Sequence, residues 1–256
     1  MASILENKNY GEVSVFLPEN LLREARRQKN IQNCSVPQIC ILDPDGDLAK
    51  YLLNIGDAKK NDCWACYHSN LFTFQIDEIE VGIIPCIVGA SYAVLVAEQL
   101  FVSGCEYLIS VTSSGIINQP STDKNFALIT EAIRDEGTSY HYLPTEMPAT
   151  IGDKIFEKLD SLSSSSLWFN AKSWTTDAPY RETQSSINEM QEQGVMCVEM
   201  EASALYAFAK AKDKKIVCFA HLTNTMAQSE GDFEKGEHFG SLRMLELIGQ
   251  VIKKIR

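Results

Sequence analysis

The segment GVMCVEMEASALYAFAKA, residues 194–211, places Glu199 and Glu201 on either side of Met200. Apolar residues recur at helical spacing after Glu201, which predicts a helix that packs on a sheet. The apolar run before it is typical of a strand, and residues two apart on a strand project to the same face. We therefore expect both carboxylates to face one cleft, where each can accept charge-assisted hydrogen bonds from a vicinal diol. The alternative for one of the two is that it caps the helix start and complements the helix dipole.

Outward from this segment, apolar β-branched runs alternate with helix-like segments. The predicted strands are 38–42, 81–88, 106–112, 126–135, 166–173 and 215–223. The predicted helices are 92–102, 185–193, 202–211 and 241–255. Such alternation indicates an α/β layer structure with a largely parallel or mixed central sheet. The length of 256 residues and the 45% hydrophobic content fit one domain, with the serine-rich run 161–166 as a surface loop.

Charge and cysteine placement exclude several classes of function. The formal net charge of −11 would repel a nucleic acid polymer or an anionic membrane surface. No segment approaches the roughly 18 apolar residues of a membrane span, so we expect a cytoplasmic protein. Cys63 and Cys66 have no second Cys/His pair nearby in the sequence, so we expect no metal. The cysteines within apolar runs are expected to be reduced and buried, namely Cys40, Cys86, Cys197 and Cys218.

Polar residues collect where the predicted strands end, which is where open α/β sheets bind ligands. Asp43, Asp45 and Asp47 surround a proline and a glycine after the first strand, and a solvated turn explains them equally well. Small residues at 89–91 allow backbone amides to approach a ligand. The segment 110–115 offers four hydroxyl side chains, which suit a phosphate, a sugar or a reactive water. Ordinary hydroxyl capping of a turn is the alternative there.

Two further strand ends carry groups suited to a planar heterocycle. The loop 174–183 has aromatic, hydroxyl and guanidinium groups, which supply ring faces and fixed donors. A plain surface loop with an Arg181–Glu182 ion pair is the competing interpretation. Asn224 ends the last buried strand and can donate a hydrogen bond to a leaving group without changing charge.

Three segments carry a family resemblance: RDEGTSYHYLPTEMPATIGD (134–153), TTDAPYRE (175–182) and VMCVEMEASALYAFA (195–209). Together they resemble the nucleoside phosphorylase superfamily, and most closely its uridine phosphorylase-like branch. The likeness runs in order from about Gln38 to the C-terminus. It implies a three-layer α/β/α fold with a mixed central sheet. The expected domain is 1–256, with about residues 1–36 as an N-terminal extension.

The resemblance implies where a sugar and a base would bind. Glu201 would bind the 2′ and 3′ hydroxyls of ribose, Met200 would contact the sugar face, and Glu199 would assist from the 2′ side as in nucleosidases. Asn224 matches a position where purine-cleaving relatives carry an acidic aspartate, and asparagine there resembles the pyrimidine branch. Arg181 or Asn224 would stabilise the leaving base. The implied base-site residues are Thr176, Pro179, Tyr180 and Arg181.

The chain departs from the family at its phosphate site. Family phosphorylases bind phosphate with three arginines, and the corresponding residues here are Gly46, Ser110 and Tyr67. Losing three guanidinium groups removes most of the charge-assisted donors to a phosphate dianion, although His68 would supply a replacement cation. Asp47 aligns with the glutamate that takes a proton from water in related nucleosidases, so phosphate and water both stay open as the nucleophile. The residues implied at this phosphate or water site are Leu42, Ser110, Ser113, Ser114 and His68.

The resemblance therefore implies an enzyme of nucleoside salvage that cleaves an N-glycosidic bond, with water or inorganic phosphate attacking C1′ of the ribose. No cofactor is implied beyond phosphate as a co-substrate, and the expected partner is a nucleoside. Relatives assemble as dimers or trimers of dimers, so a homo-oligomer is expected. A storage protein that retains the fold and a nucleoside-binding module are the other interpretations. The presence of Glu201, Met200 and Asn224 argues against a loss of catalysis.

Overall fold

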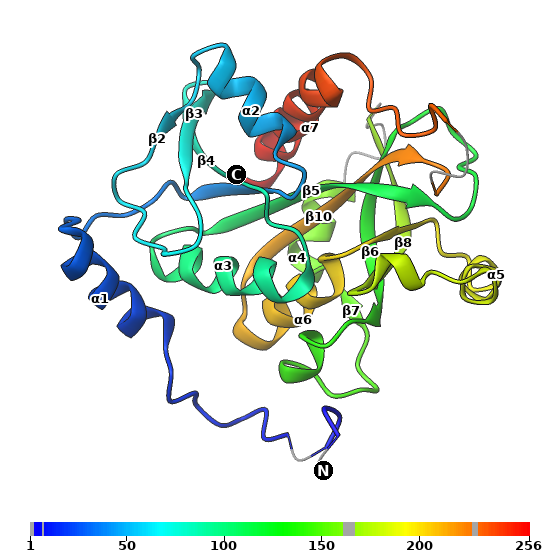
Figure 1. The fold of residues 1–256 in the computed structure, drawn as a ribbon, viewed down its shortest axis with the longest axis horizontal. Coiled ribbons are helices and arrows are strands. Elements are labelled where there is room, and N and C mark those ends of the chain that lie inside the picture. Colours follow the sequence, from blue (N-terminus) through cyan, green and yellow to red (C-terminus); the bar gives the residue numbers. More distant parts are fainter. Residues whose placement is uncertain (1–2, 7, 161–166, 227–229) are drawn as a thin grey trace.

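The computed structural model describes residues 3–6, 8–160, 167–226 and 230–256. Within these ranges a ten-stranded mixed sheet has helices packed on both of its faces (Figure 1). The helices are α1 Pro18–Lys29, α2 Asp47–Asn54, α3 Ala90–Val102, α4 Asp153–Asp160, α5 Gln184–Glu192, α6 Ala202–Lys212 and α7 Ser241–Ile255. The strands are β1 Ile39–Asp43, β2 Lys59–Lys60, β3 Phe72–Ile76, β4 Ile79–Pro85, β5 Tyr107–Ile116, β6 Phe126–Asp135, β7 Ala149–Thr150, β8 Trp168–Thr176, β9 Cys197–Glu199 and β10 Lys215–Asn224.

One half of the sheet closes on itself. The strands of the whole sheet run in the order β2-β3-β4-β1-β5-β9-β8-β6-β10, and β7 pairs with β6. Strand β10 pairs with β5 as well. Strands β5, β9, β8, β6 and β10 therefore form a ring, while β1, β4, β3 and β2 continue from β5 as an open sheet. Because β1, β4, β5 and β10 are parallel, their carboxyl ends open on the same edge of the sheet.

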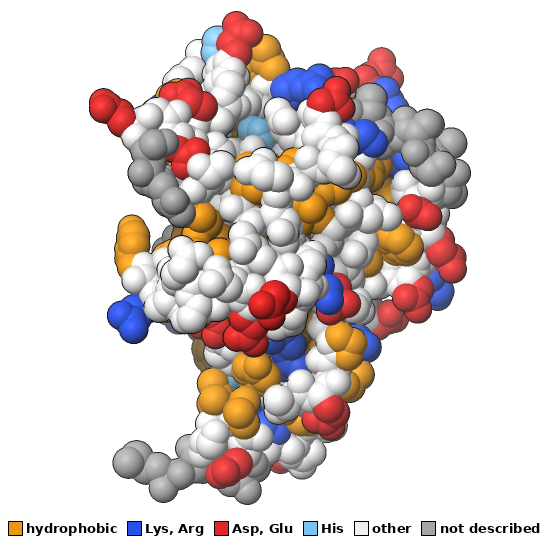
Figure 2. All heavy atoms as spheres, turned by 90° about the vertical axis from the view of Figure 1, so that its right-hand side faces the viewer, with side chains coloured by type: hydrophobic (Ala, Val, Ile, Leu, Met, Phe, Trp, Pro, Cys, Tyr) orange, Lys and Arg blue, Asp and Glu red, His pale blue; other side chains and the backbone are white. Residues whose placement is uncertain are grey.

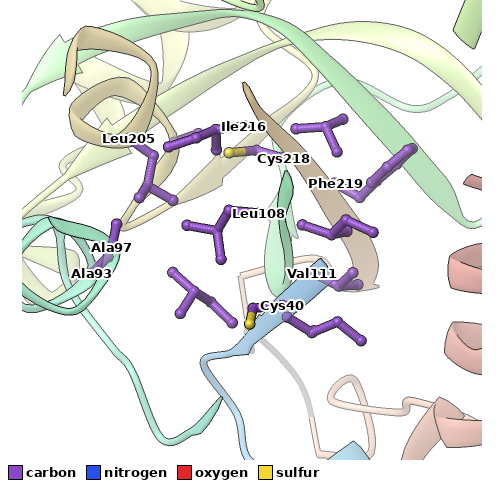
Figure 3. Close-up of a cluster of buried hydrophobic side chains, with 14 of the residues drawn as sticks. Cys40, Ala93, Ala97, Leu108, Val111, Leu205, Ile216, Cys218 and Phe219 are labelled. Carbon is purple, nitrogen blue, oxygen red and sulfur yellow. The ribbon is translucent and has the colours of Figure 1, made fainter. Parts of the chain in front are cut away.

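The core beneath α6 is built on one row of register partners in the central strands. Leu108 of β5 lies opposite Cys40 of β1 and Ile216 of β10, and all three side chains are buried. Figure 3 shows Leu205 of α6 and Ala97 of α3 beside this row. Burial of these side chains fixes α6 against the sheet, which matters because Glu201 directly precedes α6.

All the strands and helices predicted from the sequence are present, with ends shifted by a few residues. The predicted strand 81–88 ends early, at Pro85, because Cys86 adopts a φ of 61° and leaves the sheet. Cys86 is exposed, so the expectation that it is buried was wrong. The other three cysteines expected in the core are free and buried, namely Cys40, Cys197 and Cys218. The predicted surface loop 161–166 lies outside the described residues.

A disulfide joins Cys34 to Cys63, with a Cα–Cα distance of 5.3 Å. It ties the segment after α1 to the loop before β3. Cys66 is free and buried, so Cys63 and Cys66 do not act together as a pair of thiols. Disulfides are rare in cytosolic proteins, and the cytoplasmic location stays a prediction.

In the described part of the chain, no helix is both long enough and apolar enough to cross a bilayer. Figure 2 shows acidic and basic side chains interspersed on one face of the molecule, with apolar side chains between them.

Tyr206 links α6 to two strands of the ring, which gives a test of the fold. Its hydroxyl is fully buried, donates to the Ile129 carbonyl at 2.5 Å and accepts the Cys218 N–H at 3.0 Å. Tyr206→Phe deprives both backbone groups of this partner, so we expect the free energy of unfolding in urea to fall by about 1–3 kcal/mol. Tyr180→Phe, at a side chain that is 98% exposed, is the matched control and should change it by less than about 0.5 kcal/mol. Equal changes in the two variants would contradict this role of the Tyr206 hydroxyl.

Candidate functional site

Glu199 is a buried acceptor that holds the first turn of α6. Its Oε2 accepts the backbone N–H groups of Glu201 at 2.8 Å and Ala202 at 2.7 Å. Its Oε1 accepts the hydroxyls of Ser173 at 3.0 Å and Thr175 at 2.5 Å. These donors and the helix dipole stabilise the carboxylate, although burial raises its pKa. The expectation that both glutamates face one cleft from a strand was wrong, because β9 ends at Glu199 and this residue caps the helix.

Glu201 is the carboxylate with unused hydrogen-bonding capacity. It directly precedes α6, is 1% exposed, and accepts the Gly89 N–H on Oε1 at 2.7 Å. Its Oε2 is buried and has no hydrogen-bond partner among the described residues. Burial, followed by repulsion from Glu199, raises the pKa of Glu201 to about 8, while Gly89 and the Thr112 side chain oppose the rise. An unpaired buried oxygen is costly, so Oε2 of Glu201 is a candidate contact for a hydrogen-bond donor of a ligand.

Ser113 and Lys235 hold the carboxylate of Asp45. Asp45 Oδ2 accepts the Ser113 N–H at 3.0 Å and the Ser113 hydroxyl at 2.7 Å, and Asp45 Oδ1 lies 3.3 Å from Lys235 Nζ. The same ammonium lies 2.7 Å from Asp47 Oδ2, and the Lys235 side chain is only 10% exposed. The segment between β10 and α7 thus brings a cation to the carboxyl ends of β1 and β5.

Two buried titratable side chains, Asp43 and His221, lie next to this cluster. Asp43, at the end of β1, accepts the N–H groups of Gly46 and Ala49, and burial raises its pKa to about 7. His221 of β10 is buried, and burial followed by the nearby Lys235 lowers its pKa to about 4. His221 is therefore neutral at pH 7 and adds no positive charge to the site.

Asn224 lies where β10 meets the end of β5. Its Nδ2 donates to Thr223 Oγ1 at 3.1 Å and to the Ser114 carbonyl at 3.4 Å, and its Oδ1 accepts the Met226 N–H at 3.0 Å. Its register partner is Gly115, where a Cβ atom would lie 2.6 Å from Met226 Sδ. The absence of a side chain at Gly115 therefore lets Met226 fold back beside Asn224.

The predicted base loop begins in the sheet and then leaves it. Thr176 is the last residue of β8, is buried, and accepts the Ala178 N–H on its hydroxyl at 3.2 Å. Pro179–Arg181 form the short 3-10 helix η2, in which Tyr180 and Arg181 are exposed. The sheet thus fixes the position of Thr176, whereas the side chains of Tyr180 and Arg181 stand at the surface.

Two more predicted residues lie close to the buried carboxylates. Met200 is half-buried between Glu199 and Glu201. Ser110 is 1% exposed, and its hydroxyl has no hydrogen-bond partner among the described residues. Ser110 and Thr112 lie two apart on β5, so their side chains project to the same face. This face is the one on which Thr112 approaches Glu201.

Three other residues predicted for the phosphate or water site make contacts elsewhere in the fold. Leu42 is fully buried inside the sheet, where it pairs with Ile84 and Ser110. The Ser114 hydroxyl donates to the His221 carbonyl at 3.0 Å. His68 is exposed in the loop before β3, and its carbonyl accepts the Tyr92 hydroxyl at 2.7 Å. The cation that lies in the cluster around Asp45 is Lys235, and the role of His68 stays a prediction.

Three residues of this cluster were not among the predicted site residues. Asp45 and Thr112 lie in strand ends that the sequence already marks as polar, so a signal for them existed. Lys235 had none, because it lies in a polar loop far from the first strand in sequence. Its role depends on the path of the chain between β10 and α7.

Comparison with known proteins agrees with the fold just described. The sequence model of the phosphorylase superfamily matches residues 38–248. The uridine phosphorylase of Vibrio fischeri ES114 is similar in structure, with a TM-score of 0.70 and 17% identity over 86% of this chain and 92% of that chain. The purine nucleoside phosphorylase of Toxoplasma gondii, solved in complex with immucillin-H, has a TM-score of 0.70 and 15% identity over 85% of this chain and 90% of that chain. No curated protein sequence matches this chain.

The different surroundings of the two glutamates predict different effects on stability. Glu199→Ala leaves four donors without their acceptor and removes a helix cap, so we expect the free energy of unfolding to fall by about 2–4 kcal/mol. Glu201→Ala removes the acceptor of only one N–H, that of Gly89, so its loss at pH 7 should be clearly smaller. Urea denaturation of both variants measures this difference. A loss in Glu201→Ala as large as that in Glu199→Ala would contradict the assignment of Glu199 as the cap.

The raised pKa of Glu201 predicts a dependence of stability on pH. Between its ordinary value of 4.5 and the folded value of about 8, the folded protein binds more protons at this site than the unfolded chain does. The free energy of unfolding therefore falls as pH rises through this range. Glu201→Gln removes this term, so the variant should match the wild type near pH 5 and exceed it by a few kcal/mol at pH 9. Urea denaturation across this range tests it, and parallel pH curves for the two proteins would contradict the raised pKa.

Proposed function

Because this chain belongs to the phosphorylase superfamily, we propose that it is an enzyme that cleaves the N-glycosidic bond of a nucleoside. The observation that carries this proposal is the buried Oε2 of Glu201, which has no partner among the described residues. A ribose diol supplies hydroxyl donors that match such a carboxylate. The solved relatives include a uridine phosphorylase and a purine nucleoside phosphorylase, which supports a nucleoside as the substrate class.

In the proposed complex, Glu201 binds the 2′ and 3′ hydroxyls and Met200 contacts the sugar face. Hydroxyl donors favour the ionised form of a carboxylate, so the bound sugar would lower the pKa of Glu201 from its raised value. Glu199 acts through position: its hydrogen bonds to Glu201 and Ala202 fix the backbone from which the Glu201 side chain extends. This role differs from direct assistance at the 2′ side, which the family resemblance implies.

The leaving base would lie between the ends of β5 and β10. Breaking the C1′–N bond leaves its electron pair on the base and an oxocarbenium-like charge on the sugar. Asn224 would donate a hydrogen bond to the departing base by turning one Nδ2 hydrogen away from the Ser114 carbonyl, the longer of its two contacts at 3.4 Å. Thr176 lies at the end of β8, which β9 separates from β5 and β6 separates from β10 in the ring. Pro179, Tyr180 and Arg181 belong to the adjoining loop, and the exposure of Arg181 leaves its guanidinium available to a base that enters from solvent.

The nucleophile would approach C1′ beside Ser113. Thr112 approaches Glu201 while Ser113 binds Asp45, so consecutive residues of β5 join the sugar site to the polar cluster. Asp47, the predicted activator of water, has its Oδ2 2.7 Å from Lys235 Nζ. Neither phosphate nor water requires a further cofactor.

The predictions about assembly remain proposals. Large apolar side chains in the segment before α1 are exposed to water, and they include Val13, Val15 and Phe16 at 78%, 99% and 73%. Exposed apolar side chains close together mark interaction surfaces, which supports a homo-oligomer, either a dimer or a trimer of dimers. The disulfide between Cys34 and Cys63 leaves the cellular compartment open.

Base release from a panel of purine and pyrimidine nucleosides tests the proposed activity. We expect the wild type to release the base from at least one ribonucleoside. Glu201→Gln should lower kcat/KM for that substrate by about 10–100-fold, because it removes a charged hydrogen-bond acceptor. The loss should shrink when the substrate is the 3′-deoxynucleoside, since one of the two hydroxyls that pair with Glu201 is then absent.

Glu131→Gln is the matched control, because Glu131 pairs with Lys172 on β8 away from this edge of the sheet. It should leave kcat/KM unchanged for both substrates. No base release from any nucleoside by the folded wild type would contradict the proposal. An equal loss for the ribonucleoside and its 3′-deoxy analogue would contradict the contact between Glu201 and the diol.

A further inference from the structure

Three hydrogen-bond donors converge on the carboxylate of Asp45. They are the backbone N–H of Ser113 at 3.0 Å, the hydroxyl of Ser113 at 2.7 Å, and the ammonium of Lys235 at 3.3 Å. A backbone amide, a hydroxyl and a cation are a set of donors that binds a phosphate. In this protein the set forms an anion cradle, by which we mean Ser113 and Lys235, and the cradle is filled by a carboxylate of the chain itself.

The anion cradle lies next to the proposed sugar site. Ser113 follows Thr112, whose side chain approaches Glu201, and the charge of Asp45 contributes to the raised pKa of Glu201. An oxygen nucleophile held at the cradle would therefore be close to a sugar held by Glu201. The unpartnered Oε2 of Glu201 is the independent sign that a ligand binds at this edge of the sheet.

The charges around the anion cradle oppose the entry of a phosphate. Lys235 is already shared between two carboxylates, at 3.3 Å from Asp45 and 2.7 Å from Asp47. His221, with a pKa near 4, stays neutral. A phosphate would have to displace Asp45 from its three donors and then lie beside two or three carboxylates with one cation. Like charges that close together repel strongly in a partly buried site.

We propose that Asp45 selects water over phosphate as the nucleophile by occupying the anion cradle, so that the chain is a nucleoside hydrolase. This inference rests on the proposed function. Asp45 is 27% exposed at its side chain and is bound by Ser113, so water can reach it beside the sugar site. Asp47 contacts Lys235 at 2.7 Å and helps to hold that ammonium in place. The role that the sequence assigned to Asp47 therefore passes to Asp45.

The reaction that follows is a hydrolysis in which every atom is accounted for. The oxygen of water forms a bond to C1′ as the C1′–N bond breaks, and the electron pair of that bond leaves with the base. The water proton passes to the Asp45 carboxylate, which returns it to the base or to solvent. The products are free ribose and the free base.

Titration calorimetry with inorganic phosphate tests the anion cradle without any nucleoside. We expect no phosphate binding by the wild type and clear binding by Asp45→Ala, because the donors of Ser113 and Lys235 become available. Asp47→Asn is the matched control: it removes the other carboxylate from Lys235 but leaves Asp45 on Ser113, so it should gain no phosphate binding. Asp45→Ser, which suits a turn, replaces Asp45→Ala if circular dichroism shows that the alanine variant is unfolded.

Product analysis with a ribonucleoside then tests the choice of nucleophile. The wild type should give free ribose at a rate that does not depend on phosphate. Asp45→Ala should lose about 100-fold or more of this hydrolysis and should form ribose 1-phosphate when phosphate is present.

Two results would overturn the inference: ribose 1-phosphate made by the wild type, or a phosphate affinity that is the same in the wild type and Asp45→Ala. If the wild type released no base from any nucleoside, the proposed function would fail. The calorimetric comparison would still decide whether Asp45 occupies the anion cradle.

Discussion

The geometry of the site depends on the hydrogen bonds of the buried Glu199 carboxylate. This single side chain joins two hydroxyls of β8 to the first two backbone amides at the start of α6. Its position sets where the chain leaves β9 and therefore where the Glu201 side chain begins. Polar groups fixed in advance by such bonds need no reorganisation when a ligand arrives. The first glutamate of the pair is thus structural, and the second keeps one buried oxygen that has no partner among the described residues.

The site contains buried acidic side chains whose burial costs stability in the folded protein. Burial raises the pKa of Asp43 to about 7 and that of Glu201 to about 8, and one partner of Glu201 is missing among the described residues. Residues that reduce stability in this way are typical of functional sites. Lys235 offsets part of the negative charge. The segment that carries it can pass close to His221 because Gly240 has no side chain, and a Cβ atom there would lie 2.6 Å from His221 Cε1.

The sequence predicts most of the long periodic elements well and the short ones poorly, although the 12-residue helix α1 was missed too. The bounds 126–135 and 241–255 agree with β6 and α7, because many apolar residues at regular spacing define them. Helix α2 was missed because its start, Asp47, directly follows a turn-like run that ends in Gly46 with a φ of 78°. The stretch around Glu199 was misjudged because β9 has only three residues.

Part of the site was also predictable from the local sequence. Glu201, Ser113 and Asn224 stand out because each is a polar residue that follows an apolar run in the sequence. The separate roles of Glu199 and Glu201 were not predictable, since the hydroxyls of Ser173 and Thr175 that fix Glu199 come from a strand distant in sequence. Lys235 was unpredictable because only the folded path of its loop brings it to Asp45.

The central claim is that the Glu201 carboxylate binds the diol of a pentose, and the protons exchanged on binding test it most directly. The ligand is a C-nucleoside, whose base is joined to ribose through carbon and cannot leave. Titration calorimetry near pH 7 in buffers of different ionisation enthalpy measures proton release. With a pKa of about 8 in the free protein, Glu201 is largely protonated at pH 7 and must ionise to accept both hydroxyls. The account predicts proton release on binding by the wild type and none by Glu201→Gln; binding without proton release, or equal release by both proteins, would contradict it.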